Sequence, residues 1–446
     1  MSKKHTVTVV GSGYVGTTTA ALLSASNIKT FAVDIDPRKV DKLNAGKAPF
    51  FEEGLDALVA NGIKTGNLIA TQSYEESVSS SNIVMSSVGT PDNPDGSPNL
   101  DYVFMALESI AKSVMGPIIY VQKSTVPVGT GRKIIARFKE LSDREFTYVS
   151  SPEFLREGTA VIDSIEPDRI VVGGDKTAAN LIADLFLNIY NNRQKIGEVA
   201  RVELLGRQTP NVHYLNIESA ELTKVSANAF LALKISFANS IAKLADKTDA
   251  DITEVMDAIG ADNRIGRAFL NAGRGYGGGC FPKDVKGLIS SAKDFGVDMS
   301  IMTAASDTND SMPSYVVDKI EQTTEGLKGL RVAVLGLAFK AGTSDTRKSP
   351  GIKIANILAD RGAEVCAYDP EGVEEAVESL DSEVSLSDSA ENCTSTAQVV
   401  VVATEWPELK IFDYGSVDAE IIMDAMNMLD MDELESQGKT YLGIGR

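Results

Sequence analysis

The chain has only two histidines and three cysteines among its 446 residues. Neither His5 nor His213 lies near a recognisable motif, so we expect acid–base chemistry to rest on carboxylates, lysine, water or a thiol. Three scattered cysteines are too few for a disulfide framework, and this usage favours a reducing cytoplasm. We expect no bound metal.

Positive charge and long apolar runs are also scarce. The net charge of −19 argues against nucleic acid or an anionic membrane surface as a partner, although local cations still permit an anionic small ligand. No run of eighteen apolar residues occurs, and residues 1–5 lead straight into a predicted strand. We therefore expect neither a membrane span nor a signal peptide. The length predicts two or three domains.

The clearest pattern near the start is a glycine-rich turn. A predicted strand is followed by GSGYVG at 11–16, an alanine-rich helix and a second strand that ends at Asp34. Gly11 would make the tight turn, Gly13 would admit a pyrophosphate to the helix N-terminus, and Gly16 would pack helix against strand. An acidic residue at the position of Asp34 accepts hydrogen bonds from the ribose hydroxyls and repels a 2′-phosphate. NAD is therefore predicted rather than NADP.

Further strand and helix patterns give the domain plan. Predicted strands at 83–88, 118–122, 147–150 and 169–172 continue a parallel, doubly wound sheet to about residue 205. A helix without proline or glycine follows at 216–247. Its apolar residues occur on most faces, which is typical of a helix packed between domains or against a second subunit.

From residue 328 the strand–helix–strand pattern returns. The turn GLAFK at 336–340 lacks the glycine fingerprint, so a different nucleotide is expected there rather than a dinucleotide. The predicted fold is α/β, with two Rossmann-like doubly wound parallel-sheet domains joined by a long central helix. The predicted domains are residues 1–205 for NAD, 206–327 for connection between domains or to a second subunit, and 328–446 for a second nucleotide.

The sharpest chemical feature is GGGCFPKD at 277–284. Pro282 suits the first turn of a helix, which would place the Cys280 thiol at the positive end of that helix and lower its pKa. The three glycines would clear side chains from the approach to the thiol, and Asp284 lies one turn further on. The alternative is a buried core cysteine, which is how we interpret Cys366 and Cys393.

Polar residues elsewhere suggest one crevice. Ser124 and Thr125 follow a predicted strand, and Glu153 and Glu157 follow the next, spaced i,i+4 so that they could share a helix face. Solvated helix charges are the alternative for the two glutamates. Lys224 and Asn228 are also i,i+4, in an apolar stretch where the residues alone favour a lysine that extends its amine to water.

Together these motifs resemble the UDP-glucose/GDP-mannose 6-dehydrogenase family over essentially the whole chain and in the same order. The segments that carry the resemblance are GSGYVG (11–16), KSTVPVGT (123–130), SPEFLREG (151–158), ELTKVSANAFLALKISFANS (221–240), NRIG (263–266), GGGCFPKD (277–284) and GLAFKAGTSDTRKSP (336–350).

The resemblance implies roles for individual residues. The catalytic set would be Cys280 as nucleophile, with Lys224, Asn228, Asp284, Glu157 and Thr125. The NAD site would comprise Gly11, Gly13, Tyr14, Val15, Gly16, Asp34, Lys39, Thr90, Ser124, Thr125, Glu157 and Arg347. The substrate site would comprise Glu153, Phe154, Leu155, Glu157, Lys224, Asn228, Arg264, Tyr276, Gly277 and Lys340, with Arg264 reaching a substrate on the neighbouring subunit.

The implied reaction is the NAD-dependent, four-electron oxidation of the C6 alcohol of a nucleotide-sugar, UDP-glucose to UDP-glucuronate, by a homodimer or larger homo-oligomer. GDP-mannose or a UDP-N-acetylhexosamine is the alternative substrate, and a two-electron hydroxy-acid dehydrogenase or a non-catalytic sensor is the alternative class. Met426 stands where the family usually has arginine, and Asn271 where a basic residue is common. Both departures remove positive charge from the nucleotide side.

Overall fold

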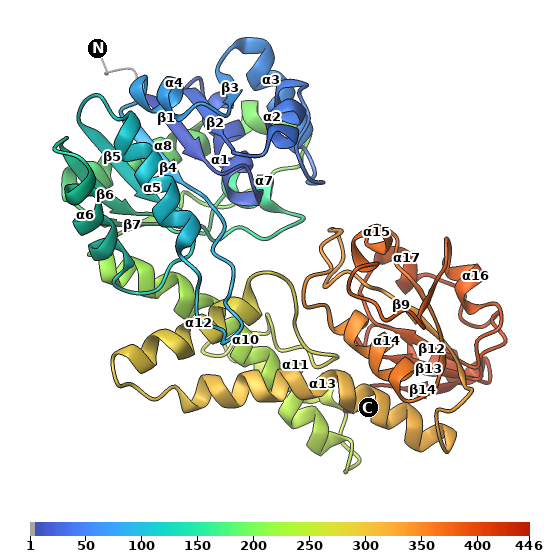
Figure 1. Cartoon of the computed structure of the whole chain (residues 1–446). Helices are drawn as coiled ribbons and strands as arrows, with labels where there is room; N and C mark the ends of the chain where they lie inside the picture. Colours follow the sequence, from blue (N-terminus) through green and yellow to red (C-terminus); the bar gives the residue numbers. More distant parts are fainter. Residues whose placement is uncertain (1–4) are drawn as a thin grey trace. The chain divides into compact units, whose positions relative to one another are not determined.

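The computed structural model describes residues 5–446. The chain divides into two compact units, Met1–Ser226 and Ala227–Arg446, and the division falls inside helix α10 (Ile217–Ala245). Each unit contains one sheet covered by helices (Figure 1). The predicted α/β fold with two doubly wound sheets and a long central helix is confirmed. The division into three domains stays a prediction.

The first sheet has the strand order β3-β2-β1-β4-β5-β6-β7-β8. Its strands are β1 (Thr6–Val10), β2 (Lys29–Val33), β3 (Leu68–Thr71), β4 (Ile83–Ser86), β5 (Ile118–Gln122), β6 (Phe146–Ser150), β7 (Arg169–Gly174) and β8 (Asn211–Leu215). Adjacent residues of β1 point to opposite faces, so Val9 and Val10 pack into separate apolar clusters. The helices of this unit before α10 are α1 (Tyr14–Ala25), α2 (Pro37–Asn44), α3 (Leu55–Thr65), α4 (Tyr74–Ser79), α5 (Asp101–Ser113), α6 (Thr130–Leu141), α7 (Ala160–Ile165), α8 (Lys176–Asn191) and α9 (Arg193–Ala200).

One pair of strands departs from the parallel arrangement predicted to residue 205. β6 and β7 pair antiparallel through Val149–Gly174 and Ser150–Gly173. The only helix between them, α7, has six residues and is about 9 Å long at 1.5 Å per residue. A helix of this length covers less than the roughly 17 Å of a five-residue strand, and the chain enters β7 from the carboxyl end of β6. The prediction of parallel strands to residue 205 was therefore wrong for this one pair.

The second unit begins within α10 and continues with α11 (Ile252–Gly260), α12 (Phe281–Asp294) and α13 (Ser300–Thr324). Its sheet has the order β11-β10-β9-β12-β13-β14, and every pairing is parallel. The strands are β9 (Arg331–Leu335), β10 (Glu364–Tyr368), β11 (Ser385–Leu386), β12 (Val399–Val402), β13 (Ile421–Asp424) and β14 (Thr440–Leu442). Its helices are α14 (Pro350–Asp360), α15 (Val373–Ala376), α16 (Ala390–Thr394), α17 (Pro407–Lys410) and α18 (Met431–Ser436).

Helix α10 is apolar enough to be tested as a membrane span. Among the helices of residues 5–446 it alone has the length and composition to cross a bilayer, and 44% of its most apolar window is buried inside the protein. A core helix passes the same test, so this is weak evidence for a span.

In both sheets, a pair of glycines lets a helix pack closely on the turn where the strand order reverses. A Cβ on Gly16 would lie 1.8 Å from the carbonyl oxygen of Gly11, and a Cβ on Gly351 would lie 2.2 Å from that of Gly336. Each pair lets a helix pack directly on the turn after the first strand. The pairs are five and fifteen residues apart, because residues 337–350 form an inserted loop in the second sheet. The insertion explains why the second turn shows no glycine fingerprint.

An aspartate follows the second strand in both sheets, but the two aspartates differ in their hydrogen bonds. Asp34 follows β2 and accepts from the N–H groups of Ser12 (2.7 Å) and Asp36 (3.0 Å). Asp369 follows β10, is 1% exposed, and accepts five hydrogen bonds, from the N–H groups of Leu337, Ala338, Glu371 and Gly372 and from the indole N–H of Trp406. Asp369 is thus saturated by its own domain and offers no acceptor for a ribose.

We predict that Asp369→Asn destabilises the second unit by about 3 kcal/mol, because an amide NH₂ facing main-chain N–H groups leaves at least two buried donors unsatisfied. Chemical denaturation measures the loss. Asp360→Asn, which removes the same charge at an exposed position of α14, is the matched control. Equal stability of the two variants would contradict the buried acceptor role.

Candidate active site

The turn after β1 has the shape that a dinucleotide requires. Gly11 has φ +95°, and a Cβ there would lie 2.8 Å from the carbonyl oxygen of Ser87. A Cβ on Gly13 would meet no atom within 4 Å, so open space lies over the turn. Gly13, the N-cap residue of α1, has no side chain that could cap the helix. A helix N-terminus beside open space fits a pyrophosphate.

The adenosine side of this turn is acidic with one nearby cation. Asp34 is 8% exposed, and the Lys39 amine lies 3.5 Å from its carboxylate. Tyr14 packs its ring on Phe50 with 3.9 Å between ring centroids, and Val15 follows it in the first turn of α1. The residues of this edge therefore fit NAD.

Three predicted NAD residues come together at the carboxyl ends of β4 and β5. The Ser124 hydroxyl donates to the carbonyl of Val88 at 2.6 Å. The Thr90 hydroxyl donates to the carbonyl of Thr125 at 3.0 Å. These strand ends lie next to the β1–β4 reversal, where open α/β sheets bind ligands.

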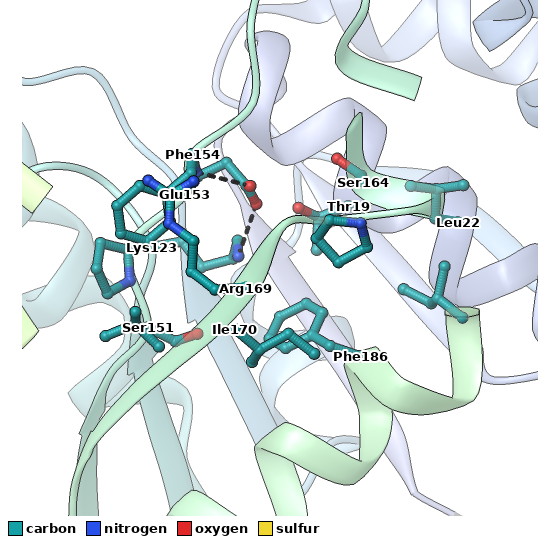
Figure 2. Close-up of a pocket in the computed structure, with 14 residues that line it drawn as sticks. Thr19, Leu22, Lys123, Ser151, Glu153, Phe154, Ser164, Arg169, Ile170 and Phe186 are labelled. Carbon is teal, nitrogen blue, oxygen red and sulfur yellow. Dashed lines mark hydrogen bonds and ion pairs between the residues drawn. The ribbon is translucent and has the colours of Figure 1, made fainter. Parts of the chain in front are cut away.

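The segment after β6 is not helical. Residues 151–156 have no regular structure, and α7 begins only at Ala160, so the helix face proposed for Glu153 and Glu157 does not exist. Glu153 instead forms an ion pair with Lys123, 2.9 Å between Oε2 and Nζ (Figure 2). Burial acts to raise the pKa of the Glu153 carboxyl, but the charge of Lys123, hydrogen bonds and the charge of Lys224 lower it overall.

Phe154 lies between two cations of the same unit. The Arg169 guanidinium carbon is 3.9 Å from the centre of the Phe154 ring, and the Lys224 amine is 5.1 Å from it. Lys224 is only 8% exposed, so it does not extend its amine to water as the residues alone favoured. Its contact with an aromatic face orients a buried positive charge.

A small cavity of about 40 Å³ lies beside this cluster, room for one or two waters. Figure 2 shows Lys123, Glu153 and Arg169 at one side of it. The remaining lining is largely apolar and includes Leu22, Ile170 and Phe186.

In the second unit, Cys280 is exposed and occupies the N-cap position of α12, with Pro282 in its first turn. The predicted placement of the thiol at a helix N-terminus is confirmed. Asp284 is 3% exposed and accepts from the Asn228 amide (2.6 Å) and the Lys283 amine (2.7 Å).

The glycines before Cys280 also make room for another segment of the second unit. A Cβ on Gly277 would lie 2.5 Å from the Lys348 carbonyl oxygen, one on Gly278 would lie 2.8 Å from the Phe339 ring, and one on Gly279 would lie 2.6 Å from the Arg347 guanidinium. The glycines therefore admit the inserted loop 337–350. The expectation that they clear the approach to the thiol missed this contact.

The other predicted substrate residues of the second unit have varied surroundings. Tyr276 is 8% exposed, its N–H donates to Asn309 Oδ1 (2.7 Å), and burial raises the pKa of its hydroxyl to about 12. Arg264 is 89% exposed and pairs with Asp262. Arg347 pairs with Asp345, and the Lys340 amine lies 5.9 Å from the Phe339 ring centre. Leu155 belongs to the irregular segment after β6.

Several residues in these clusters were missed by the sequence reasoning. Lys123 and Lys283 lie inside motifs that were quoted without a role for them, and Arg169 and Asn309 lie outside every motif. Lys123 could have been predicted, because it directly follows a buried strand. The local sequence around Arg169 and Asn309 contains no feature that predicts a role for them.

A dinucleotide turn with an acidic ribose site, a cysteine at a helix N-terminus and a second nucleotide-type sheet define an NAD-dependent dehydrogenase. Three family models match the chain: the NAD binding domain of the UDP-glucose/GDP-mannose dehydrogenase family over residues 5–193, its central domain over 218–311, and its UDP binding domain over 333–431. The chain belongs to this family, and its cofactor is NAD.

The relatives agree over the full length. A UDP-glucose 6-dehydrogenase of Rickettsia bellii is 38% identical, across 98% of this chain and 99% of the relative. The solved UDP-glucose dehydrogenase of Pyrobaculum islandicum is 34% identical, with a TM-score of 0.89 over 100% of this chain and 99% of that one. The solved UDP-D-ManNAc dehydrogenase of Pyrococcus horikoshii is 27% identical, with a TM-score of 0.84 over 99% of each chain.

We predict that Lys123→Met and Glu153→Gln each destabilise the first unit by about 3 kcal/mol at pH 7, and that the double variant recovers more than half of the summed loss. Each single change leaves one charge, that of the buried Lys123 or of the half-buried Glu153, without its partner. Chemical denaturation of the four proteins measures the coupling, with exposed Lys133→Met as the control.

The pH dependence follows from the sign of the shift. The pKa of folded Glu153 lies below its ordinary value of 4.5, so the stability it contributes is present above pH 4.5 and is lost as the pH falls through the folded pKa. The coupling should therefore shrink as the pH falls from 4.5 through the folded pKa. A coupling that does not shrink on acidification would show that the pair is not ionic.

Proposed function

We propose that this chain oxidises UDP-glucose to UDP-glucuronate with two molecules of NAD, through a covalent intermediate on Cys280. The observation that carries the proposal is the exposed Cys280 at the N-cap of α12, one turn before the buried Asp284–Asn228 pair. The UDP binding domain of the family and the names of the relatives support the nucleotide and the sugar.

The residues of the NAD turn would hold the cofactor by its pyrophosphate and ribose. Gly11, Gly13, Gly16 and the α1 N-terminus would receive the phosphates, and Asp34 with Lys39 would contact the ribose. NAD supplies a hydride acceptor when bound. Conversion of CH₂OH to a carboxylate removes four electrons, so the overall reaction uses two NAD per sugar.

The covalent step belongs to Cys280. The thiolate adds to the carbonyl carbon of the C6 aldehyde and forms a thiohemiacetal, whose oxidation gives a thioester. Water then adds to the thioester carbon, the C–S bond breaks, and the carboxylate and the thiolate are released. Covalent capture keeps the aldehyde from escaping and divides one difficult oxidation into easier steps.

The charged and amide groups around this chemistry would stabilise oxygen and position water. We assign the oxyanions formed at C6 to Lys224 and Asn228, which lie four residues apart on α10; one such donor contributes about 10²–10³ in rate. Activation of water is assigned to Glu157 with Thr125, or to Asp284. Glu153, Phe154, Leu155, Tyr276, Gly277, Arg264 and Lys340 would contact the nucleotide-sugar, and Thr90, Ser124 and Arg347 would complete the NAD site.

We also propose a homodimer formed through α10. Leu222, Phe230, Phe237 and Leu244 recur every seven or eight residues on one side of this helix, and all four are at least 43% exposed. A continuous apolar stripe of this kind on a long helix is typical of helix–helix association. The low cysteine content, three residues in the chain, supports a reducing cytoplasm as the compartment.

Steady-state oxidation of a panel tests the reaction. With UDP-glucose we expect two NADH per sugar consumed and no free aldehyde, because Cys280 retains the C6 carbon between the two oxidations. NADH absorbance and product analysis are measured in parallel with GDP-mannose and UDP-N-acetylhexosamines. One NADH per sugar would assign a two-electron dehydrogenase, and no NADH with any sugar would assign a sensor.

A second prediction concerns the nucleophile. Cys280→Ser should bind NAD and UDP-glucose as the wild type does but lose steady-state turnover by more than about 10³-fold, because the alkoxide of serine is far less available than a thiolate. Mass spectrometry of the intact variant tests whether an ester-like adduct is trapped. Cys366→Ser, in the second sheet, is the matched control and should remain active. Near-normal uronate formation by Cys280→Ser would exclude the covalent mechanism.

A further inference from the structure

Arg274 is the largest fully buried side chain in the described residues, with 1% of its surface exposed. It lies in the loop between α11 and α12, six residues before Cys280. Large cations are rarely buried without a partner, because removing a charge from water costs several kcal/mol. The burial of this side chain therefore needs an explanation.

The contacts of Arg274 converge on one edge of the second sheet. Its Nη2 donates to the Phe339 carbonyl (2.9 Å), after β9, and to the Thr404 hydroxyl (3.2 Å), after β12. Its main-chain N–H donates to the Ala425 carbonyl (2.9 Å), after β13. β9 and β12 are the strands between which the order of this sheet reverses. Ligands of open α/β sheets bind at the carboxyl ends of the strands at such a reversal.

The remaining donors of Arg274 are unsatisfied. Its Nε and Nη1 are buried and make no hydrogen bond to any residue in the described range 5–446. The nearby carboxylates are Glu405 and Asp369, and Asp369 already accepts five hydrogen bonds. Burial lowers the pKa of the guanidinium to about 10, so Arg274 is charged at neutral pH.

We propose that Arg274 supplies the positive charge that holds the diphosphate of the nucleotide-sugar at the β9–β12 reversal. This inference rests on the proposed function. It identifies Arg274 as the residue whose charge binds the phosphate groups of the ligand at the UDP binding domain. A buried guanidinium acts on an anion through a medium of low dielectric constant, where the attraction is stronger than in water. Its Nε and Nη1 still carry N–H groups, each of which can donate a charge-assisted hydrogen bond to a phosphate oxygen.

The position of Arg274 also brings a positive charge to the end of β13, where Met426 brings none. Ala425, whose carbonyl accepts from the Arg274 N–H, is followed by Met426, which brings no charge to this edge. Arg274 therefore delivers a cation to the end of β13 from a different segment of the chain. Nothing in the local sequence of the loop at 273–279 distinguishes this arginine from a solvent-exposed one.

The test separates phosphate recognition from support of the fold. Binding of uridine, UMP and UDP is measured by calorimetry without turnover, for the wild type and for Arg274→Gln. We expect uridine affinity to be unchanged and UDP affinity to fall about tenfold to a hundredfold, the usual effect of one lost charge-assisted contact. Arg331→Gln is the matched control, because it removes the same charge at the opposite end of β9 and should change none of the three affinities.

Arg274→Lys keeps the charge without the fork of donors, and it serves if Arg274→Gln does not fold. Arg274→Lys should retain more than half of the binding free energy that the wild type gains between uridine and UDP. An equal loss for uridine, UMP and UDP in either variant would show that Arg274 only supports the turn, and would overturn the proposal. Because no turnover is measured, an inactive wild type that still prefers UDP to uridine would refute the proposed reaction and leave this assignment standing.

Discussion

Both nucleotide-type sheets depend on the close approach of a helix to the turn that precedes it. Gly16 lies against the carbonyl of Gly11, and Gly351 lies against that of Gly336, at distances that leave no space for a Cβ. This approach brings the end of the first strand next to the end of the fourth, beside the reversal of strand order. The ligand edge of each sheet follows from that one contact, because a helix displaced by a methyl group would separate the strand ends from the helix N-terminus.

The two sheets differ in the aspartate after their second strand and in the loop after their first strand. In the first sheet the turn is short, open space lies over Gly13, and Asp34 keeps 8% of its surface exposed. In the second sheet Asp369 is saturated by its own domain, and residues 337–350 extend from the turn to the glycines that precede Cys280. The absence of the glycine fingerprint from the second turn and the support of the loop before Cys280 thus arise from one insertion.

Charge in this protein is separated by location. The net charge is −19, yet three cations, Lys123, Lys224 and Arg274, are each less than 9% exposed. A buried positive charge is screened far less than a surface one, so it can act on an anion despite an acidic exterior, although Lys123 is already paired with Glu153. Each of the three lies near a strand end or against an aromatic ring rather than on a solvated surface.

The local order of residues was enough to predict the two sheets, the long helix α10, the NAD turn and the place of Cys280 at a helix N-terminus. These features depend on periodicity, on glycine and proline at fixed spacing, and on contacts within a few residues. Tertiary structure alone decided the antiparallel β6–β7 pair, the irregular segment that carries Glu153, and the partners of Lys123, Asp369 and Arg274. Those depend on which strand ends meet in space, and residues 65 or 130 positions apart, such as Arg274 with Phe339 or Thr404, leave no mark on each other's local sequence.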